Sequence, residues 1–178
     1  MNKPSQRKAD MAVQPYQRLV SLPIKSENIF HFPDGLPAFE SVKEFIFIMR
    51  PDTQPFVFMH SLNPPDLAFV CVDPFLICRE YLPKISDADR DFLGLKNQSD
   101  ALLLAIVTVR DDVRECTANL QGPIVINIQN SIGRQVICEG QNYPVRYNIW
   151  NALDRLSEEP GQELSGRMKT ALAGVQPV

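Results

Sequence analysis

HFPDGLPAFE at residues 31–40 and DLAFVCVDPF at residues 66–75 each describe a strand that ends at a corner fixed by proline. At the start of the first stretch, Phe30 and Phe32 alternate with Ile29 and His31, and Pro-Asp-Gly at 33–35 then turns the chain. Proline presets φ, and glycine accepts the positive φ that a tight turn can require. In the second stretch, the apolar run is too short for a helix and stops at Asp-Pro. Both stretches therefore favour β-structure.

The rest of the chain repeats this pattern of short apolar runs separated by Pro, Gly, Asn or Asp. Regular spacing of such runs is typical of an antiparallel sandwich or a small barrel. We therefore predict an all-β fold, mainly an antiparallel small barrel or sandwich, with one short helix and a helical C-terminal extension. The expected strands are 16–22, 28–32, 45–49, 56–60, 67–72, 75–78, 102–109, 124–128, 134–138 and 143–147.

One short helix is predicted inside this pattern, directly after Ser86. The Ser86 hydroxyl is a suitable N-cap, and Asp87 and Asp89 favour the positive end of a helix. Gly94 is placed to end the helix in the left-handed conformation. We expect the helix to lie between these two signals.

The composition divides the chain of 178 residues into three parts. Residues 1–15 are polar and basic, so we expect a disordered tail. Residues 16–147 carry the strand pattern and form one β-barrel domain, a size that buries an adequate core. Residues 148–178 form an extension of different character.

Helical spacing of apolar residues characterises the extension. Ile149, Leu153 and Leu156 lie on one helical face, and a second apolar stripe follows the break at 158–161. Such short helices are marginal unless something covers them. Three alternatives follow for the extension: its helices pack on the barrel of the same chain, they contact a partner or a second copy, or they form a frayed tail.

The charge distribution disfavours a nucleic acid as direct partner. The net charge is −3, and residues 61–100 contain seven acidic and four basic side chains. Binding driven by counterion release needs several aligned Lys or Arg side chains, which the body of the chain lacks. No apolar segment is long enough to cross a membrane, and no signal peptide is present, so we expect a reduced, cytoplasmic protein without membrane contact.

The sequence offers little for catalysis or metal binding. The four cysteines have no CxxC spacing, and there are only two histidines, neither in a recognisable motif. Zinc sites and nucleophilic triads need such groupings. No phosphate-binding or dinucleotide-binding glycine motif occurs. We therefore expect core cysteines, no metal, no cofactor and no enzymatic activity.

Together, the two opening stretches and several later segments resemble the bacterial flagellar assembly factor FliW family. The later segments are SDAD and FLGL within 86–95, ALLLAIVTV at 101–109, TANL at 117–120, PIVIN at 123–127, GRQV at 133–136 and YPVR at 143–146. They occur in the family's order, and the resemblance runs from Tyr16 to Tyr147. The basic tail and the extension lie outside it.

The resemblance implies a binding protein with two protein partners. FliW-like proteins bind flagellin before its export and also bind CsrA, an RNA-binding translational regulator. Free factor antagonises CsrA by a non-competitive route and relieves repression of flagellin mRNA; flagellin, when abundant, occupies the factor. The acidic excess in 61–100 is consistent with attraction to a basic protein. The alternative is a FliW-like β-barrel adaptor whose partners have changed through the extension.

Candidate contact residues lie at strand ends, turns and family motif positions. They are Asp34, Leu36, Phe39, Asp66, Asp73, Phe75, Asn119, Asn127 and Arg134. Leu36 or Phe39, if exposed, would anchor an amphipathic helix of flagellin, and Leu36→Asp would then weaken binding without unfolding the domain. The alternative is that both residues plug one end of the barrel. Similarly, the aspartates and asparagines either contact partners or hold backbone turns.

Overall fold

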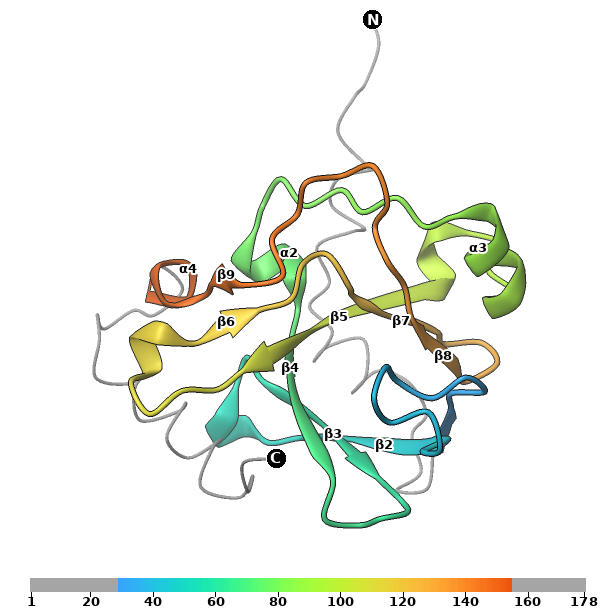
Figure 1. Cartoon of the computed structure of the whole chain (residues 1–178), viewed down its shortest axis with the longest axis horizontal. Coiled ribbons are helices and arrows are strands. Elements are labelled where there is room, and N and C mark those ends of the chain that lie inside the picture. Colours follow the sequence, from blue (N-terminus) through green and yellow to red (C-terminus); the bar gives the residue numbers. More distant parts are fainter. Residues whose placement is uncertain (1–28, 155–178) are drawn as a thin grey trace, which may run out of the picture.

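The computed structural model describes residues 29–154, in which short strands predominate (Figure 1). The strands are β1 (Phe30–His31), β2 (Glu44–Met49), β3 (Val57–Ser61), β4 (Ala68–Val72), β5 (Ala101–Thr108), β6 (Thr117–Ala118), β7 (Ile124–Asn127), β8 (Ile132–Gln135) and β9 (Tyr147–Asn148). The helices are α2 (Pro74–Ile77), α3 (Asp87–Leu93) and α4 (Trp150–Asp154), with 3-10 turns at Pro51–Thr53, Gln98–Asp100 and Val113–Glu115.

Seven of these strands close into a barrel in the order β4-β3-β2-β1-β8-β7-β5. The barrel closes because β4 also pairs with β5, with Cys71 opposite Ile106. Every pairing is antiparallel except that of β1 with β8, where His31 lies opposite Ile132. β6 and β9 extend the sheet beyond the end of β5. The predicted all-β fold is confirmed, and of the two architectures it is the barrel.

Alternate residues of the strands fill the inside of the barrel. We call this set the inner core: Phe30, Phe32, Leu36, Val42, Phe45, Val57, Met59, Leu67, Cys71, Leu102, Leu104, Ile124 and Ile126. Phe32 packs edge-on against Phe45, and Gly133 of β8 lies against the same ring. A Cβ at Gly133 would lie 2.7 Å from Phe32 Cε1, so only glycine fits there.

The other face of several strands is also buried, beneath helices and loops. We call this set the outer core: Phe56, Phe58, Val70, Val72, Ile77, Tyr81, Leu93, Ala101, Leu103, Ala105, Val107, Val113, Cys116, Ala118, Leu120, Val125, Val136, Ile149, Ala152 and Leu153. β5 is therefore buried on both faces, with Leu102 and Leu104 inward and Leu103 outward.

Several local predictions are confirmed. The Ser86 hydroxyl accepts a hydrogen bond from the Asp89 amide, and α3 ends at Gly94 with φ +68°. Gly35 has φ +71° at the first corner, as the turn requires. All four cysteines are free, and three of them are buried.

Several predicted strands are wrong, shorter or shifted. The strand predicted at 134–138 corresponds to β8, which begins earlier, at Ile132, and ends at Gln135. Of the strand predicted at 75–78, residues 75–77 belong to helix α2 and Cys78 is its C-cap, because Pro74 suits a first helical turn and Asp73 caps it. In 143–147 only Tyr147 enters a strand, since Pro144 has no N–H to donate and the Tyr143 hydroxyl accepts a hydrogen bond from the Leu82 amide.

The predictions for the two ends lie mostly outside the described residues. The expected first strand at 16–22, the basic tail and the second helical stripe are not described. Of the first stripe, Ile149 and Leu153 are fully buried in the outer core, and Trp150 packs against it. The start of the extension therefore packs on its own barrel. No helix within residues 29–154 combines the length and apolarity needed to span a bilayer.

Candidate protein-binding surface

Arg134 of β8 ties together three segments that are distant in the sequence. Its guanidinium donates to Asp89 of α3 (Nη1 to Oδ1, 2.9 Å) and to Asp34 in the first corner (Nη2 to Oδ2, 2.7 Å). It also lies over the Phe92 ring, 4.2 Å from the centroid. The Arg134 side chain is 31% exposed, so each ion pair contributes about 0.2–1 kcal/mol and the cation–π contact a similar amount. We call Asp34, Asp89, Phe92 and Arg134 the Arg134 cluster.

Two asparagines hold the end of α3 against the barrel. Asn127 is 2% exposed, and its amide donates to the carbonyls of Leu93 (2.9 Å) and Gly94 (3.1 Å). The Asn130 amide donates to the Leu93 carbonyl as well. The last carbonyls of a helix have no partner within it, so these amides satisfy them. α3 is therefore fixed at both its side and its end.

A hollow of about 550 Å³ lies beside the Arg134 cluster. We call it the α3 groove, and its lining residues are Lys84, Ile85, Ser86, Asp87, Asp89, Arg134, Gln135, Ile137 and Glu139. One wall comes from the segment that leads into α3, and the other from β8 and the residues that follow it. Figure 1 shows the segment after β8 rising across the segment that joins α2 to α3.

Apolar side chains are exposed around this groove. Ile137 is 53% exposed on one wall, and Phe92 is 36% exposed under Arg134. Leu82, two residues before Lys84, is 66% exposed. Apolar groups ringed by charges are typical of a surface that binds another protein.

The structure brings only part of the predicted contact set to this surface. Asp34 and Arg134 meet directly, and Asn127 lies below α3. The sequence analysis identifies Asp89 only as an acidic residue that favours the positive end of the helix, and Phe92 only as part of the FLGL motif. Their spacing of three residues puts them on one helical face, which is the signal that could have joined them.

Leu36 and Phe39 do not lie on the surface as free anchors. Leu36 is 2% exposed in the inner core, and Phe39 packs edge-on against Phe69, with ring centroids 5.2 Å apart. The expectation of an exposed Leu36 is therefore wrong, and the alternative of a plug at the barrel end fits both residues. The cause is the turn itself, in which the Phe39 amide donates to the Leu36 carbonyl.

The residues of the second corner are separated from the groove. Asp66 is exposed before β4, whereas Asp73 is buried after it and accepts a hydrogen bond from the Phe75 amide (2.8 Å). Phe75 packs against Tyr81. Asn119 accepts a hydrogen bond from the Gly122 amide and holds a turn. Partner contact by these four predicted residues stays a prediction.

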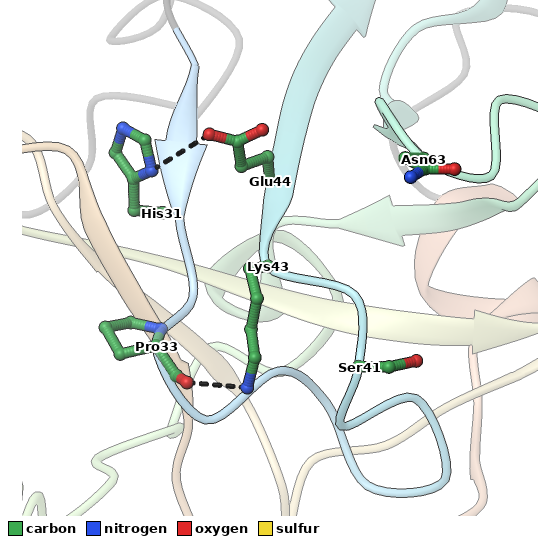
Figure 2. Close-up of a pocket in the computed structure, with 6 residues that line it drawn as sticks. All are labelled: His31, Pro33, Ser41, Lys43, Glu44 and Asn63. Carbon is green, nitrogen blue, oxygen red and sulfur yellow. Dashed lines mark hydrogen bonds and ion pairs between the residues drawn. The ribbon is translucent and has the colours of Figure 1, made fainter.

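A second hollow, of about 380 Å³, lies at the first corner (Figure 2). His31 lies 3.6 Å from Glu44, and the Lys43 ammonium donates to the Pro33 carbonyl, so these polar groups are engaged in holding the corner. Within residues 29–154, no group of three or more His, Cys, Asp or Glu side chains is arranged to hold a metal ion. The α3 groove is thus the better candidate.

Comparison with known proteins gives a consistent result. The family model described as FliW protein matches residues 15–149. The flagellar assembly factor FliW of Moorella thermoacetica is 40% identical over 134 residues, which cover 75% of this chain and 85% of that protein. Its counterpart in Leptospira biflexa is 34% identical over 140 residues, covering 78% and 92%.

The same family is found among solved structures. A crystal structure of the flagellar assembly factor FliW superimposes with a TM-score of 0.66 at 34% sequence identity, covering 72% of this chain and 89% of that one. The barrel and the sequence motifs thus lead to one answer. This chain belongs to the FliW family of flagellar assembly factors.

Proposed function

We propose that this chain is a cytoplasmic, non-enzymatic factor that binds flagellin and, at another time, the translational regulator CsrA. Binding of CsrA relieves repression of flagellin mRNA, and binding of flagellin restores it. Membership of the FliW family, a family of flagellar assembly factors, supports this assignment.

The observation that carries a binding function is the Arg134 cluster with its groove. Side chains fill the barrel interior, so a large partner has to be recognised on the outside. Two residues from family motifs, Asp34 and Arg134, meet on that outside across 100 positions of sequence. Their hydrogen bonds fix the surface before a partner arrives, which lowers the entropic cost of association.

The regulatory step is a pair of linked equilibria. One pool of factor is shared, so occupancy by flagellin lowers the amount of factor left for CsrA. The acidic groups of the groove, Asp87 and Asp89 among them, favour a basic partner. Antagonism from outside the RNA surface of CsrA then fits the non-competitive route.

The test is titration of the full chain with the flagellin and the CsrA of its own organism, first separately and then in competition. We expect binding to both, with flagellin displacing CsrA. Binding to flagellin alone would leave an export factor without the regulatory step. Binding to neither would contradict the proposal.

Two arginine variants connect the test to the surface. Arg134→Met removes both ion pairs of the cluster, and we expect it to weaken at least one partner by about tenfold. Arg114→Met is the matched control, because Arg114 also forms an ion pair with an aspartate, Asp112, but does not line the groove. Equal effects of the two variants would exclude the groove as the site.

The alternative function is an adaptor whose partners have changed through the extension. It is favoured by one observation: the family model ends at residue 149, and the chain continues to Val178. A chain that ends at residue 154 keeps α4 in the outer core. Loss of all partner binding in that shortened chain would favour the adaptor.

A further inference from the structure

The α3 groove contains two carboxylates that take no part in a salt bridge among the described residues. Asp87 lies in the first turn of α3, and Glu139 follows β8 on the other wall. Neither forms an ion pair within residues 29–154, whereas Asp89 is engaged by Arg134. The Ile137 side chain, two residues before Glu139, is 53% exposed. The groove therefore offers two carboxylates and one apolar contact to a ligand.

Hydrogen bonds hold the two walls of the groove in place. The Gln141 side-chain amide donates to the Leu82 carbonyl and accepts from the Lys84 amide, each at 2.7 Å. The Tyr143 hydroxyl accepts from the Leu82 amide at 2.9 Å. These bonds join the segment that leads into α3 to the segment that follows β8. The groove therefore exists before a ligand enters it.

The barrel domain and the start of the chain carry charges of opposite sign. Residues 29–154 contain sixteen acidic and ten basic side chains, which gives a net charge of −6. Residues 1–28 contain five basic and two acidic side chains, which gives a net charge of +3. Opposite charges at a surface attract one another over about 8 Å at physiological ionic strength. The start of the chain is therefore complementary in charge to the domain that follows it.

The basic side chains at the start of the chain are followed by apolar ones. In order, these side chains are Lys3, Arg7, Lys8, Met11 and Val13. We call residues 3–13 the basic segment. The family model begins at residue 15, so the basic segment lies outside the part of the chain that this model matches. Its basic and apolar side chains are complementary to the carboxylates and the exposed isoleucine of the groove.

The described part of the chain begins close to the groove. His31 of β1 lies opposite Ile132 of β8, and Arg134, which lines the groove, is two residues farther along β8. Two residues of a strand span about 7 Å. The 21 residues from Lys8 to Ile29 reach about 70 Å when they are fully extended. The connecting chain therefore lets the basic segment reach the groove, and it raises the local concentration of the segment to about millimolar.

We propose that the α3 groove binds the basic segment of its own chain. The Lys and Arg side chains of the segment contact Asp87 and Glu139, and its apolar side chains pack on Ile137. Single ion pairs at a surface are weak, so the contact depends on the connection within one chain and is sensitive to salt. A basic partner has to displace the segment, so the segment lowers the affinity for that partner. This last step rests on the proposed function, with the RNA-binding protein CsrA as the basic partner.

Cross-linking locates the basic segment without any partner. In the full chain, a carbodiimide reagent joins a lysine directly to a carboxylate when the two are in contact. We expect Lys3 and Lys8 to be joined to Asp87 or Glu139 at least about fivefold more often than to a control carboxylate. The control is Asp66, which is exposed before β4 and lies outside the groove. Equal yields at Asp66, or no product in the groove, would overturn the proposal.

An equal mixture of isotopically labelled and unlabelled chains separates contacts within one chain from contacts between two copies. We expect both ends of each cross-link to carry the same label. The yield should fall at least about threefold in about 1 M salt, where charges are screened within about 3 Å. Cross-links between labelled and unlabelled chains would show that a second copy supplies the segment, and a yield unaffected by salt would exclude ion pairs. Either result would overturn the proposal.

Two sets of glutamine substitutions remove the same amount of charge from different segments. The first set, in the basic segment, is Lys3→Gln, Arg7→Gln and Lys8→Gln. The control set, near the other end of the chain, is Arg155→Gln, Arg167→Gln and Lys169→Gln. We expect the methyl resonances of Ile137 to shift in the first variant only, and those of Ile48, exposed on β2 outside the groove, to shift in neither. Equal shifts of Ile137 in the two variants, or no shift in the first, would overturn the proposal.

The same two variants test the consequence for partner binding. We expect CsrA to bind the first variant about threefold more tightly than the control variant, because the two have the same net charge and only the first frees the groove. Equal affinities would overturn the competition between the segment and CsrA. Failure of CsrA to bind any of these chains would overturn the proposed function and this competition with it. The cross-links need no partner, so they decide separately whether the segment occupies the groove.

Discussion

The inner and outer cores are built in different ways from the same strands. Strand residues and two adjoining corners supply the inner core, and Phe30 and Phe45 are typical members. The outer core also takes side chains from separate segments, such as Tyr81 after α2 and Leu153 of α4. The inner core therefore depends on one event, closure of the barrel, whereas the outer core is assembled piece by piece. The proposed partner-binding surface, the α3 groove, is formed by segments that contribute to or flank the outer core.

Polar anchors mark this difference. The Tyr81 hydroxyl is buried in the outer core and donates to the Leu120 carbonyl at 2.7 Å, with the Cys138 thiol beside it. Burial, with the nearby Cys138, raises the pKa of this hydroxyl, so it remains protonated as a donor. Beside the inner core, Ser61 lies opposite Phe45 and is 3% exposed, and its hydroxyl accepts a hydrogen bond from the nearby Asn63 amide. The Tyr81 hydrogen bond thus joins two distant segments of the outer core, whereas the Ser61 hydrogen bond stays within its own turn.

The largest effect is expected from a charge in the inner core. Leu36→Asp puts a carboxylate at a position 2% exposed among phenylalanines, and an uncompensated buried charge costs about 3–5 kcal/mol. We expect the free energy of unfolding, measured by urea denaturation, to fall by that amount. Asp34→Asn, two residues away and exposed, is the control and should lose less than about 1 kcal/mol. A fully stable Leu36→Asp variant would mean that the barrel end opens freely.

The next effect is expected in the outer core, where loss should be local. Leu153→Ala removes a fully buried side chain of α4 and should cost about 2–4 kcal/mol. Trp150, the only tryptophan of the chain, reports on this core by fluorescence. We expect the fluorescence transition to precede the circular dichroism transition of the barrel in this variant. Coincident transitions would show that the two cores unfold as one unit.

Thiol labelling compares the opening of the two cores directly. Complete burial raises the pKa of Cys71, in the inner core, to about 12. Burial also raises the pKa of Cys116, in the outer core, and of Cys138, which lies beside Tyr81 of that core. A thiol reagent reaches each group only when its surroundings open. In a Cys78→Ala background, we expect Cys116 and Cys138 to react about tenfold faster than Cys71. A faster reaction of Cys71 would show that the inner core opens more readily than the outer core.

The smallest effect is expected at His60, on β3, which belongs to neither core. Burial lowers the pKa of His60 from 6.5. As the pH falls below 6.5, the unfolded chain therefore takes up the proton before the folded one does, and stability decreases. We expect the decrease in Tm to stay below about 2 °C between pH 7 and pH 5.5 and to diminish in His60→Gln. His31→Gln, at an exposed histidine, is the control; an equal effect there would contradict the assignment.

Local signals were sufficient for most strands and for α3. The apolar run that forms β5 and the Ser86 cap depend on neighbours in sequence, and the sequence analysis predicts both. Helix α2 was predicted as a strand because its apolar run is short, although Asp73 and Pro74 are a cap and a first helical residue. A helix of four residues is too short to show the helical spacing of apolar residues from which a helix is predicted.

The candidate site was predicted only in part because its geometry is non-local. Asp34 and Arg134 were singled out from motifs, yet nothing in the sequence joins them to each other or to Phe92. That contact requires β1 and β8 to be neighbours, in the only parallel pairing among the described strands. The burial of Leu36 likewise depends on how the first corner folds back, which turn residues alone do not specify.

The pairing of β1 with β8 has a consequence for synthesis on the ribosome. Asp34 leaves the ribosome 100 residues before Arg134 does, an interval of about 5–20 s at ordinary elongation rates. During that time the hairpins of β2, β3 and β4 can form, but the seam of the barrel stays open. A chain released before residue 134 lacks the cluster and one wall of the groove. The surface that we propose for partner binding is therefore completed only after β8 has been synthesised.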